Sequence, residues 1–247
     1  MSALIDDLAR SLDPIGFAIE VGIDPDPWQA DLLTTSESAI LLNCARQSGK
    51  STATALKALH TALYDPGLIL MLAPAQRQSI ELFRKLKALY SMLEGVPGTV
   101  NESTMQLELE NGSRIIALPG SEASIRGYSA PKLIIVDEAA RTDDSLFTAI
   151  RPMLATGQGQ LIALSTPRGK RGWYYEQYIG GKGWKRYQVL ASDCPRISDE
   201  YLQQEREMIG EWQYSQEFEC RFVDTCETFF STELIERAMV EMEPLWN

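Results

Sequence analysis

The strongest chemical signal in the chain is the segment 44–51, which reads CARQSGKS. It matches the pattern GxxxxGK followed by Ser or Thr except at the first position, where Cys44 replaces glycine. Backbone N–H groups of such a loop wrap phosphate oxygens, and the following helix adds a favourable dipole. In this pattern Lys50 reaches the β- and γ-phosphates, and the Ser51 hydroxyl ligates Mg²⁺. The segment therefore predicts a phosphate-binding loop, with a start less tightly turned than usual.

Two acids follow an apolar run at 133–138, which reads LIIVDE. The ends of parallel strands point at the ligand crevice of an α/β sheet. We expect Asp137 to hold the Mg²⁺ water shell and Glu138 to orient and deprotonate the attacking water. Taken alone, such a string is more often a strand end at the surface, but its pairing with the phosphate loop favours catalysis.

Two further segments admit two interpretations each. Ser165 and Thr166 end another apolar run, where short hydroxyls could sense the γ-phosphate; the alternative is an ordinary turn. The amide of Gln29, after Trp28, can read an adenine edge because it both donates and accepts hydrogen bonds; the alternative is packing. The full set of expected nucleotide-binding residues is Trp28, Gln29, Arg46, Gln47, Ser48, Gly49, Lys50, Ser51 and Thr52.

Phosphoryl transfer also needs a positively charged group near the equatorial oxygens, on which negative charge develops in the transition state. Arg46 lies inside the phosphate loop, and Arg126 lies in a loop shortly before the acid-bearing run. Either side chain could act as an arginine finger, and the alternative for Arg126 is a surface salt bridge.

The elements that would position these residues are the strands and helices of a parallel sheet covered on both faces. Apolar runs at 39–43, 68–72, 133–136 and 160–164 predict buried parallel strands, which alternate with helices. The expected helices cover 4–12, 28–33, 75–93, 143–154, 198–220 and 231–242 and the segment after residue 51, and Asn111-Gly112 predicts a hairpin between 104–109 and 114–118. We expect an α/β core over residues 1–170 and a small C-terminal subdomain over 171–247.

Composition limits the remaining classes of function. The chain has 247 residues, 45% of them apolar, and a net charge of −11, which argues against a uniformly basic nucleic-acid binder. With four scattered cysteines and a single histidine, we expect no zinc site. We also expect no membrane-spanning helix and no signal peptide.

Together these motifs resemble the ATPase domain of phage large terminases, along roughly residues 26 to 235. The quoted strings are 27–29 (PWQ), 45–51 (ARQSGKS), 73–74 (AP), 125–127 (IRG), 136–140 (VDEAA) and 165–167 (STP). The resemblance implies a P-loop NTPase of the ASCE type with a lid from about residue 171, and a trans-acting arginine finger on the segment that holds Arg126. It also implies ATP and Mg²⁺ as cofactors, and that the chain lacks the family's nuclease domain.

The resemblance further implies partners. These are double-stranded DNA, a portal protein, a small terminase subunit and further copies in a ring of about five subunits; the fragment by itself could be a monomer. The expected location is the host cytoplasm, at the procapsid, with no membrane.

Two basic clusters are candidates for a DNA face. On the helix expected at 75–93, Arg77 and Arg84 lie opposite an apolar side and are flanked by Lys85 and Lys87. The second cluster comprises Arg168, Lys170 and Arg171. We expect one of them to contact DNA phosphates; the alternative is a solvated surface.

Two other functions remain open. A helicase-like translocase shares these motifs but needs a second core, for which the residues after Thr166 are too few. A nucleotide-gated assembly module would bind ATP without turnover, and Glu138 argues against it because pure binding needs no base.

Overall fold

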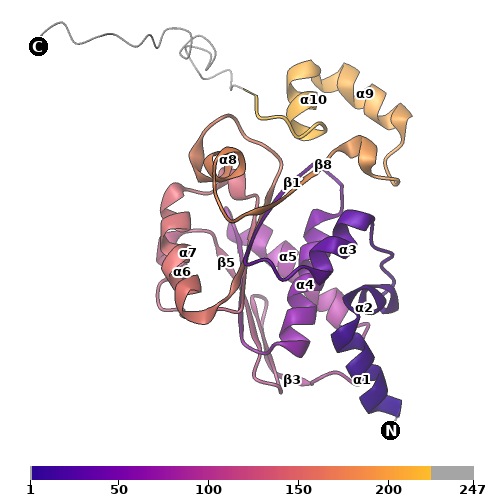
Figure 1. The fold of residues 1–247 in the computed structure, drawn as a ribbon, viewed down its shortest axis with the longest axis vertical. Helices are drawn as coiled ribbons and strands as arrows, with labels where there is room; N and C mark the ends of the chain where they lie inside the picture. The colour runs from indigo at the N-terminus through magenta and orange to yellow at the C-terminus, as the bar shows by residue number, and fades with distance from the viewer. Residues whose placement is uncertain (1, 224–247) are drawn as a thin grey trace, which may run out of the picture.

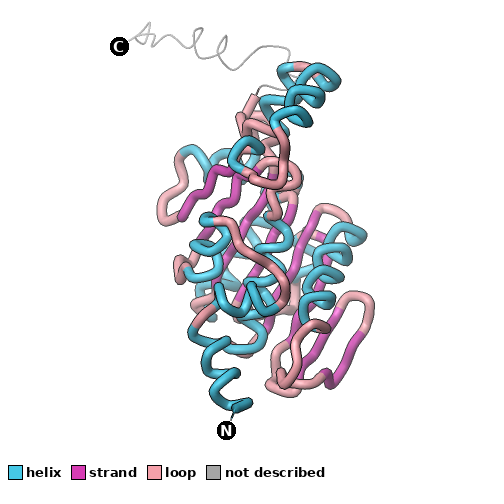
Figure 2. Tube along the Cα trace, turned by 90° about the vertical axis from the view of Figure 1, so that its right-hand side faces the viewer, coloured by secondary structure: helices cyan, strands magenta, loops and turns pink. Residues whose placement is uncertain are grey.

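The computed structural model describes residues 2–223 of the chain. One eight-stranded sheet runs through them, and helices cover both of its faces (Figure 1, Figure 2). The strand order is β3-β4-β5-β2-β6-β7-β1-β8. The strands are β1 (Ala39–Cys44), β2 (Leu68–Ala73), β3 (Thr99–Glu102), β4 (Gln106–Leu109), β5 (Arg114–Pro119), β6 (Leu133–Asp137), β7 (Gln160–Ser165) and β8 (Lys185–Val189).

Six neighbouring strands of the sheet are parallel, in the order β5, β2, β6, β7, β1 and β8. Strands β4 and β3 add an antiparallel edge next to β5. The central strands β1, β2, β6 and β7 are buried almost throughout, which requires side chains that are apolar on both faces. This explains why their sequences are continuous apolar runs. The expected α/β sheet is confirmed.

The first face of the sheet is covered by helices from the N-terminal part of the chain. Ile40 and Leu42 of β1 point to this side and pack with Phe17, Leu56 and Phe83. These helices are α1 (Ser2–Leu12), α2 (Pro14–Glu20), α3 (Pro27–Thr34), α4 (Lys50–Tyr64) and α5 (Gln76–Tyr90).

The second face carries a separate apolar core. Leu41 of β1 points to this side and packs in a cluster with Leu146, Ile150 and Trp173. The helices here are α6 (Glu122–Ile125), α7 (Asp144–Gly157) and α8 (Gly172–Ile179), with the short 3-10 turn η1 (Ala139–Arg141) after β6.

A third small core lies at the end of the molecule opposite α1 (Figure 1). It joins the start of the phosphate loop, at Ala45, to apolar side chains such as Leu202, Tyr214 and Phe218. The elements here are the 3-10 turn η2 (Ala191–Asp193), α9 (Asp199–Ile209) and α10 (Glu211–Glu217).

Several boundaries differ from those expected. The helix expected at 198–220 is two helices, because the chain turns at Gly210 with φ +80°. Elements α2, β3, α6, α8 and β8 were not expected from the sequence. The helix expected at 231–242 lies outside the described residues.

The boundary expected near residue 171, between the core and a C-terminal subdomain, does not coincide with the end of the main sheet. Strand β8, which lies beyond that boundary, pairs in parallel with β1 as the edge strand of the main sheet. The part that packs apart from the sheet begins near Ala191 and contains α9 and α10. Within the described residues, no helix is both long and apolar enough to cross a bilayer.

Candidate nucleotide-binding site

The predicted motifs meet at the carboxyl ends of three neighbouring strands. Strand β1 leads into the phosphate loop, β6 ends in Asp137, and β7 lies between them and ends in Ser165. Because all three strands are parallel, their last residues open on the same edge of the sheet. The structure thus brings together the phosphate loop, Asp137, which lies 86 residues after Ser51, and Ser165.

The phosphate loop turns later than the sequence pattern suggests. Cys44 still belongs to β1 and pairs with Val189, and the first left-handed residue is Gln47, with φ 58°. Gly49 has φ +88°, and α4 begins at the next residue. Lys50 folds back so that its Nζ donates to the Ala45 carbonyl at 3.3 Å, inside the loop that is expected to hold phosphates.

Ser51 and Asp137, the two residues that we expect to ligate the metal, lie within hydrogen-bond distance of each other. The Ser51 hydroxyl donates to Asp137 Oδ2 at 3.5 Å, and Asp137 Oδ1 accepts from the Glu138 amide at 2.9 Å. Burial, followed by the negative charge of Glu138, raises the pKa of Asp137. A hydroxyl and a carboxylate oxygen that converge from two elements suit Mg²⁺, which prefers oxygen ligands and shares them with substrate phosphates.

Gln29, in α3, lies against the phosphate loop. Its side chain is buried, with only 6% of the residue exposed. Its Oε1 accepts from the Asp26 amide at 2.9 Å, and its Nε2 donates to the Ser48 carbonyl at 3.4 Å. The amide therefore helps to position the loop, and Trp28 packs against the first core. An adenine-reading role for either residue stays a prediction.

Sequence reasoning missed Arg196, which completes this side of the site. Its guanidinium makes two hydrogen bonds to the Asp26 carboxylate, at 2.9 and 2.6 Å, and its Nη2 lies 3.4 Å from the Ser48 carbonyl. Arg196 lies between η2 and α9, so it ties the C-terminal part to the loop. No local signal in the sequence marks a contact across 170 residues.

A second missed residue, Arg141, contacts both Glu138, the expected catalytic base, and Thr166, which is expected to take part in coupling. In η1 its guanidinium pairs with Glu138 and lies 3.4 Å from the Thr166 hydroxyl. It also lies 3.6 Å from Glu217 of α10. The sequence did contain a signal, since Arg141 is three residues after Glu138.

The two candidate arginine fingers occupy different environments. Arg46 donates from Nε to Glu217 at 2.7 Å, and this hydrogen bond is the largest cause that raises the pKa of Arg46. Arg126 follows α6, is 74% exposed and pairs at 2.5 Å with Glu122, its neighbour one helical turn earlier. In this chain Arg46 thus lies beside the site, and Arg126 is at the surface, accessible to another molecule.

The basic residues of α5 do not form one uniform face. The apolar side expected for this helix is buried, which confirms its orientation. Arg84 pairs with Glu81 at 2.6 Å, and Lys87 pairs with Glu102. Arg77 and Lys85 line a cavity that also contains Glu138. The second cluster, Arg168, Lys170 and Arg171, is exposed in the loop before α8.

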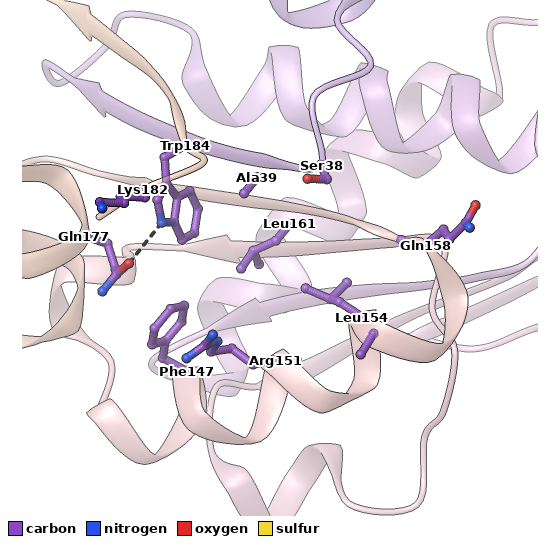
Figure 3. A pocket seen from close by; sticks show the side chains of 12 residues that line it. Ser38, Ala39, Phe147, Arg151, Leu154, Gln158, Leu161, Gln177, Lys182 and Trp184 are labelled. Atoms are coloured by element: carbon purple, nitrogen blue, oxygen red, sulfur yellow. Dashed lines mark hydrogen bonds between the residues drawn. The ribbon is translucent and has the colours of Figure 1, made fainter. Parts of the chain in front are cut away.

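A larger cavity, of about 680 Å³, lies at the other end of the strands (Figure 3). It opens beside Ala39 and Leu161 at the starts of β1 and β7, and Phe147 of α7 and Trp184 line it. The Trp184 indole donates to Gln177 at 3.0 Å across its rim. None of the motif residues lines this cavity, so we expect the nucleotide site at the opposite ends of the strands.

The family model for the terminase large subunit, T4likevirus-type, N-terminal, matches residues 41–237. The chain belongs to this family of large terminase subunits. The curated large terminase subunits of Thermus virus P23-45 and Thermus phage G20c are each 29% identical over 160 residues. That alignment covers 57% of this chain and 32% of each relative, so the chain spans about a third of their length.

Solved large terminases share the fold. The ATPase domain from Thermus phage P74-26 superimposes with a TM-score of 0.67 at 21% identity, over 84% of this chain and 98% of that domain. The large terminase of bacteriophage D6E gives 0.68 at 14% identity, over 80% of this chain and 53% of that one. The HK97 large terminase gives 0.59 at 19% identity, over 84% and 47%.

Proposed function

We propose that this chain is an ATPase that powers the movement of double-stranded viral DNA into a procapsid. The observation that carries the proposal is the convergence of Lys50, Ser51, Asp137 and Glu138 at one edge of the sheet in a large terminase fold. Related structures support the nucleotide, because the D6E large terminase was solved with ADP and with ATP-gamma-S.

In the proposed reaction, the phosphate loop and Lys50 bind the triphosphate through backbone N–H groups and one ammonium. Ser51 and Asp137 would hold Mg²⁺, which neutralises charge on the phosphate oxygens. Glu138 orients a water molecule and takes its proton as the water attacks the γ-phosphorus. Positive charge on the transition state comes from Arg46 of the same chain or from Arg126 of a neighbour.

The coupling step is assigned to the contacts of Arg141 and Glu217. Arg141 touches both Glu138 and Thr166, so a change at the γ-phosphate reaches the end of β7. Glu217 joins Arg46 and Arg141 to α10. A γ-phosphate that attracts Arg46 competes with Glu217 for the same guanidinium. Nucleotide binding would therefore loosen α9 and α10, which act as the lid in this proposal.

The proposed partners follow from the family. They are duplex DNA, a portal protein, a small terminase subunit and other copies in a ring of about five subunits, in the host cytoplasm. For the DNA contact we keep the exposed cluster Arg168, Lys170 and Arg171. The cations of α5 are divided between ion pairs and the catalytic cavity.

The test is steady-state ATP hydrolysis against protein concentration, with and without duplex DNA, for the wild type and Glu138→Gln. Turnover that requires Glu138, without strand separation, supports a packaging ATPase. Strand separation would favour a helicase-like translocase. Equal, negligible turnover in both proteins with ATP binding retained would favour a nucleotide-gated assembly module.

A further inference from the structure

A cavity of about 260 Å³ lies between α5 and the catalytic carboxylates. One wall is formed by the residues assigned to metal binding and catalysis. The other wall is formed by one face of α5, whose residues recur once per helical turn. The lining residues are Ser51, Arg77, Gln78, Glu81, Leu82, Lys85, Asp137 and Glu138. The cavity thus continues directly from the place where the γ-phosphate reacts.

The cations of this cavity differ from the other basic residues of the helix. Arg84 and Lys87 are engaged by Glu81 and Glu102. Among residues 2–223, neither Arg77 nor Lys85 makes an ion pair, although both line the cavity. The lining also contains the carboxylates of Glu81, Asp137 and Glu138, so a small anion in this cavity would depend on the two cations that no ion pair engages.

The cavity and the residue expected to bind the adenine ring, Gln29, lie on opposite sides of Ser51 and Asp137. Gln29 of α3 and Arg196 both contact the Ser48 carbonyl of the phosphate loop, which follows β1. Helix α5 follows β2, which neighbours β6 on the side away from β7 and β1. A nucleotide with its base on the Gln29 side would therefore point its γ-phosphate towards this cavity, and ADP that stayed in the loop would block the way back past the base.

We propose that the cavity is an exit site in which Arg77 and Lys85 bind inorganic phosphate after hydrolysis. The inference rests on the proposed ATPase function. Water adds to the γ-phosphorus, the bond to the β-phosphate oxygen breaks, and the products are ADP, inorganic phosphate and a proton. No covalent bond forms with the cavity. The planar guanidinium of Arg77 suits two phosphate oxygens, and the Lys85 ammonium adds a point charge.

The test is equilibrium dialysis of radiolabelled inorganic phosphate against the full chain with Mg²⁺ and saturating ADP. The variants are Arg77→Gln and Lys85→Gln, and the matched control is Lys87→Gln, on the same helix but outside the cavity. Each cavity variant should raise the phosphate Kd about tenfold, as loss of one charge-assisted hydrogen bond predicts. The control should leave the phosphate Kd unchanged, and ADP affinity should stay constant in all four proteins.

Three outcomes would overturn the inference. The first is an unchanged phosphate Kd in both cavity variants. The second is phosphate binding that Lys50→Ala abolishes while the cavity variants retain it, which places the anion only at the γ-position. The third is reduced affinity for duplex DNA with phosphate binding intact, which assigns the two cations to the DNA backbone. Because dialysis needs no turnover, phosphate binding dependent on Arg77 in a chain without Glu138-dependent hydrolysis would refute only the ATPase proposal.

Discussion

The carboxylate of Glu217 in α10 lies 2.7 Å from Nε of Arg46 in the phosphate loop. Glu217 is almost buried, with 7% of its side chain exposed, whereas the Arg46 side chain is 60% exposed. The backbones meet as well, since the Arg46 amide donates to the Glu217 carbonyl at 3.1 Å. One residue of the C-terminal helices therefore restrains both the main chain and the side chain of the loop that is expected to hold the nucleotide.

This contact predicts that Glu217→Gln binds ATP more tightly than the wild type. The γ-phosphate and the Glu217 carboxylate compete for Arg46, so removing the charge of Glu217 leaves the guanidinium available. The exposure of Arg46 reduces the gain to about 1 kcal/mol, or about fivefold in Kd. A fluorescent-nucleotide titration measures it.

The matched control for Glu217→Gln is Glu219→Gln. Glu219 belongs to the same segment but pairs with Arg206 and Arg221, away from the phosphate loop. ATP affinity should be unchanged in this control. Weaker ATP binding in Glu217→Gln than in the wild type would mean that Glu217 positions Arg46 for the nucleotide rather than competing with it.

Gly49 predicts a second effect, on stability. Its φ of +88° disfavours any side chain, and a Cβ there would lie 2.6 Å from Nε2 of Gln29. Gly49→Ala should destabilise the chain by more than the ~1–2 kcal/mol of a left-handed residue, because the clash adds to the strain. Gly183→Ala is the control for backbone strain without a clash, since φ is +77° and no atom lies within 4 Å of the added Cβ.

Urea unfolding of both variants, of Gln29→Ala and of Gly49→Ala combined with Gln29→Ala separates the cost of the strain from that of the clash. In the Gln29→Ala background, Gly49→Ala should cost only the part that comes from the strain. If Gly49→Ala and Gly183→Ala lose equal stability, Gln29 does not press on the loop.

The sequence predicted the parts of the site that are encoded locally. Strands β1, β6 and β7 are apolar runs, because both faces are buried, and each motif directly follows one of them. Knowing the strand ends was therefore enough to expect Ser51 near Asp137, which the structure confirms at 3.5 Å. The fold class followed from the same alternation of strands and helices.

Contacts that depend on how distant elements dock were not predictable in this way. Strand β8 reads KRYQV, because an edge strand has exposed positions that need no apolar residue, so it lacked the signal of the central strands. All residues of β3 are exposed. Glu217 and Arg196 reach the loop only because α9 and α10 pack on Ala45 through the third core. Nothing in the neighbouring sequence of either residue indicates that contact.

Lys57 predicts a dependence of stability on pH. It lies partly buried in α4 and donates to the carbonyls of Leu33 and Thr35. Burial lowers its pKa from 10.5 to about 8. Between these values the unfolded chain binds a proton that the folded chain does not. The free energy of unfolding therefore rises with pH, by up to about 1.4 kcal/mol per pH unit from this group.

The measurement is urea unfolding of the wild type and Lys57→Met at pH 8, 9 and 10. Titrating groups that do not interact with Lys57 contribute equally to both proteins, so the difference between them reports Lys57 together with its repulsion from Lys185. The wild type should gain stability relative to the variant as pH rises. Parallel pH profiles would show that Lys57 keeps its ordinary pKa in the folded chain.

Arg126 predicts complementation between inactive chains. Its only ion pair among the described residues is with Glu122 of α6, the short helix that Arg126 follows, so Arg126→Ala should leave the Tm and the ATP affinity of the isolated chain unchanged. If the side chain acts on a neighbour, turnover in the assembled ring should fall by about 10³-fold or more. Arg114→Ala, on β5, is the control for loss of a surface arginine and should retain turnover.

Mixing Arg126→Ala with Glu138→Gln then decides between the two arginines. Each variant lacks one half of the composite site, and a mixed interface joins the intact Glu138 of one chain to the intact Arg126 of the other. Turnover should therefore reappear in the mixture and increase more steeply than linearly with protein concentration. If Arg126→Ala alone hydrolyses ATP at the wild-type rate and mixing it with Glu138→Gln adds no turnover, the positive charge that stabilises the transition state comes from Arg46 in the same chain.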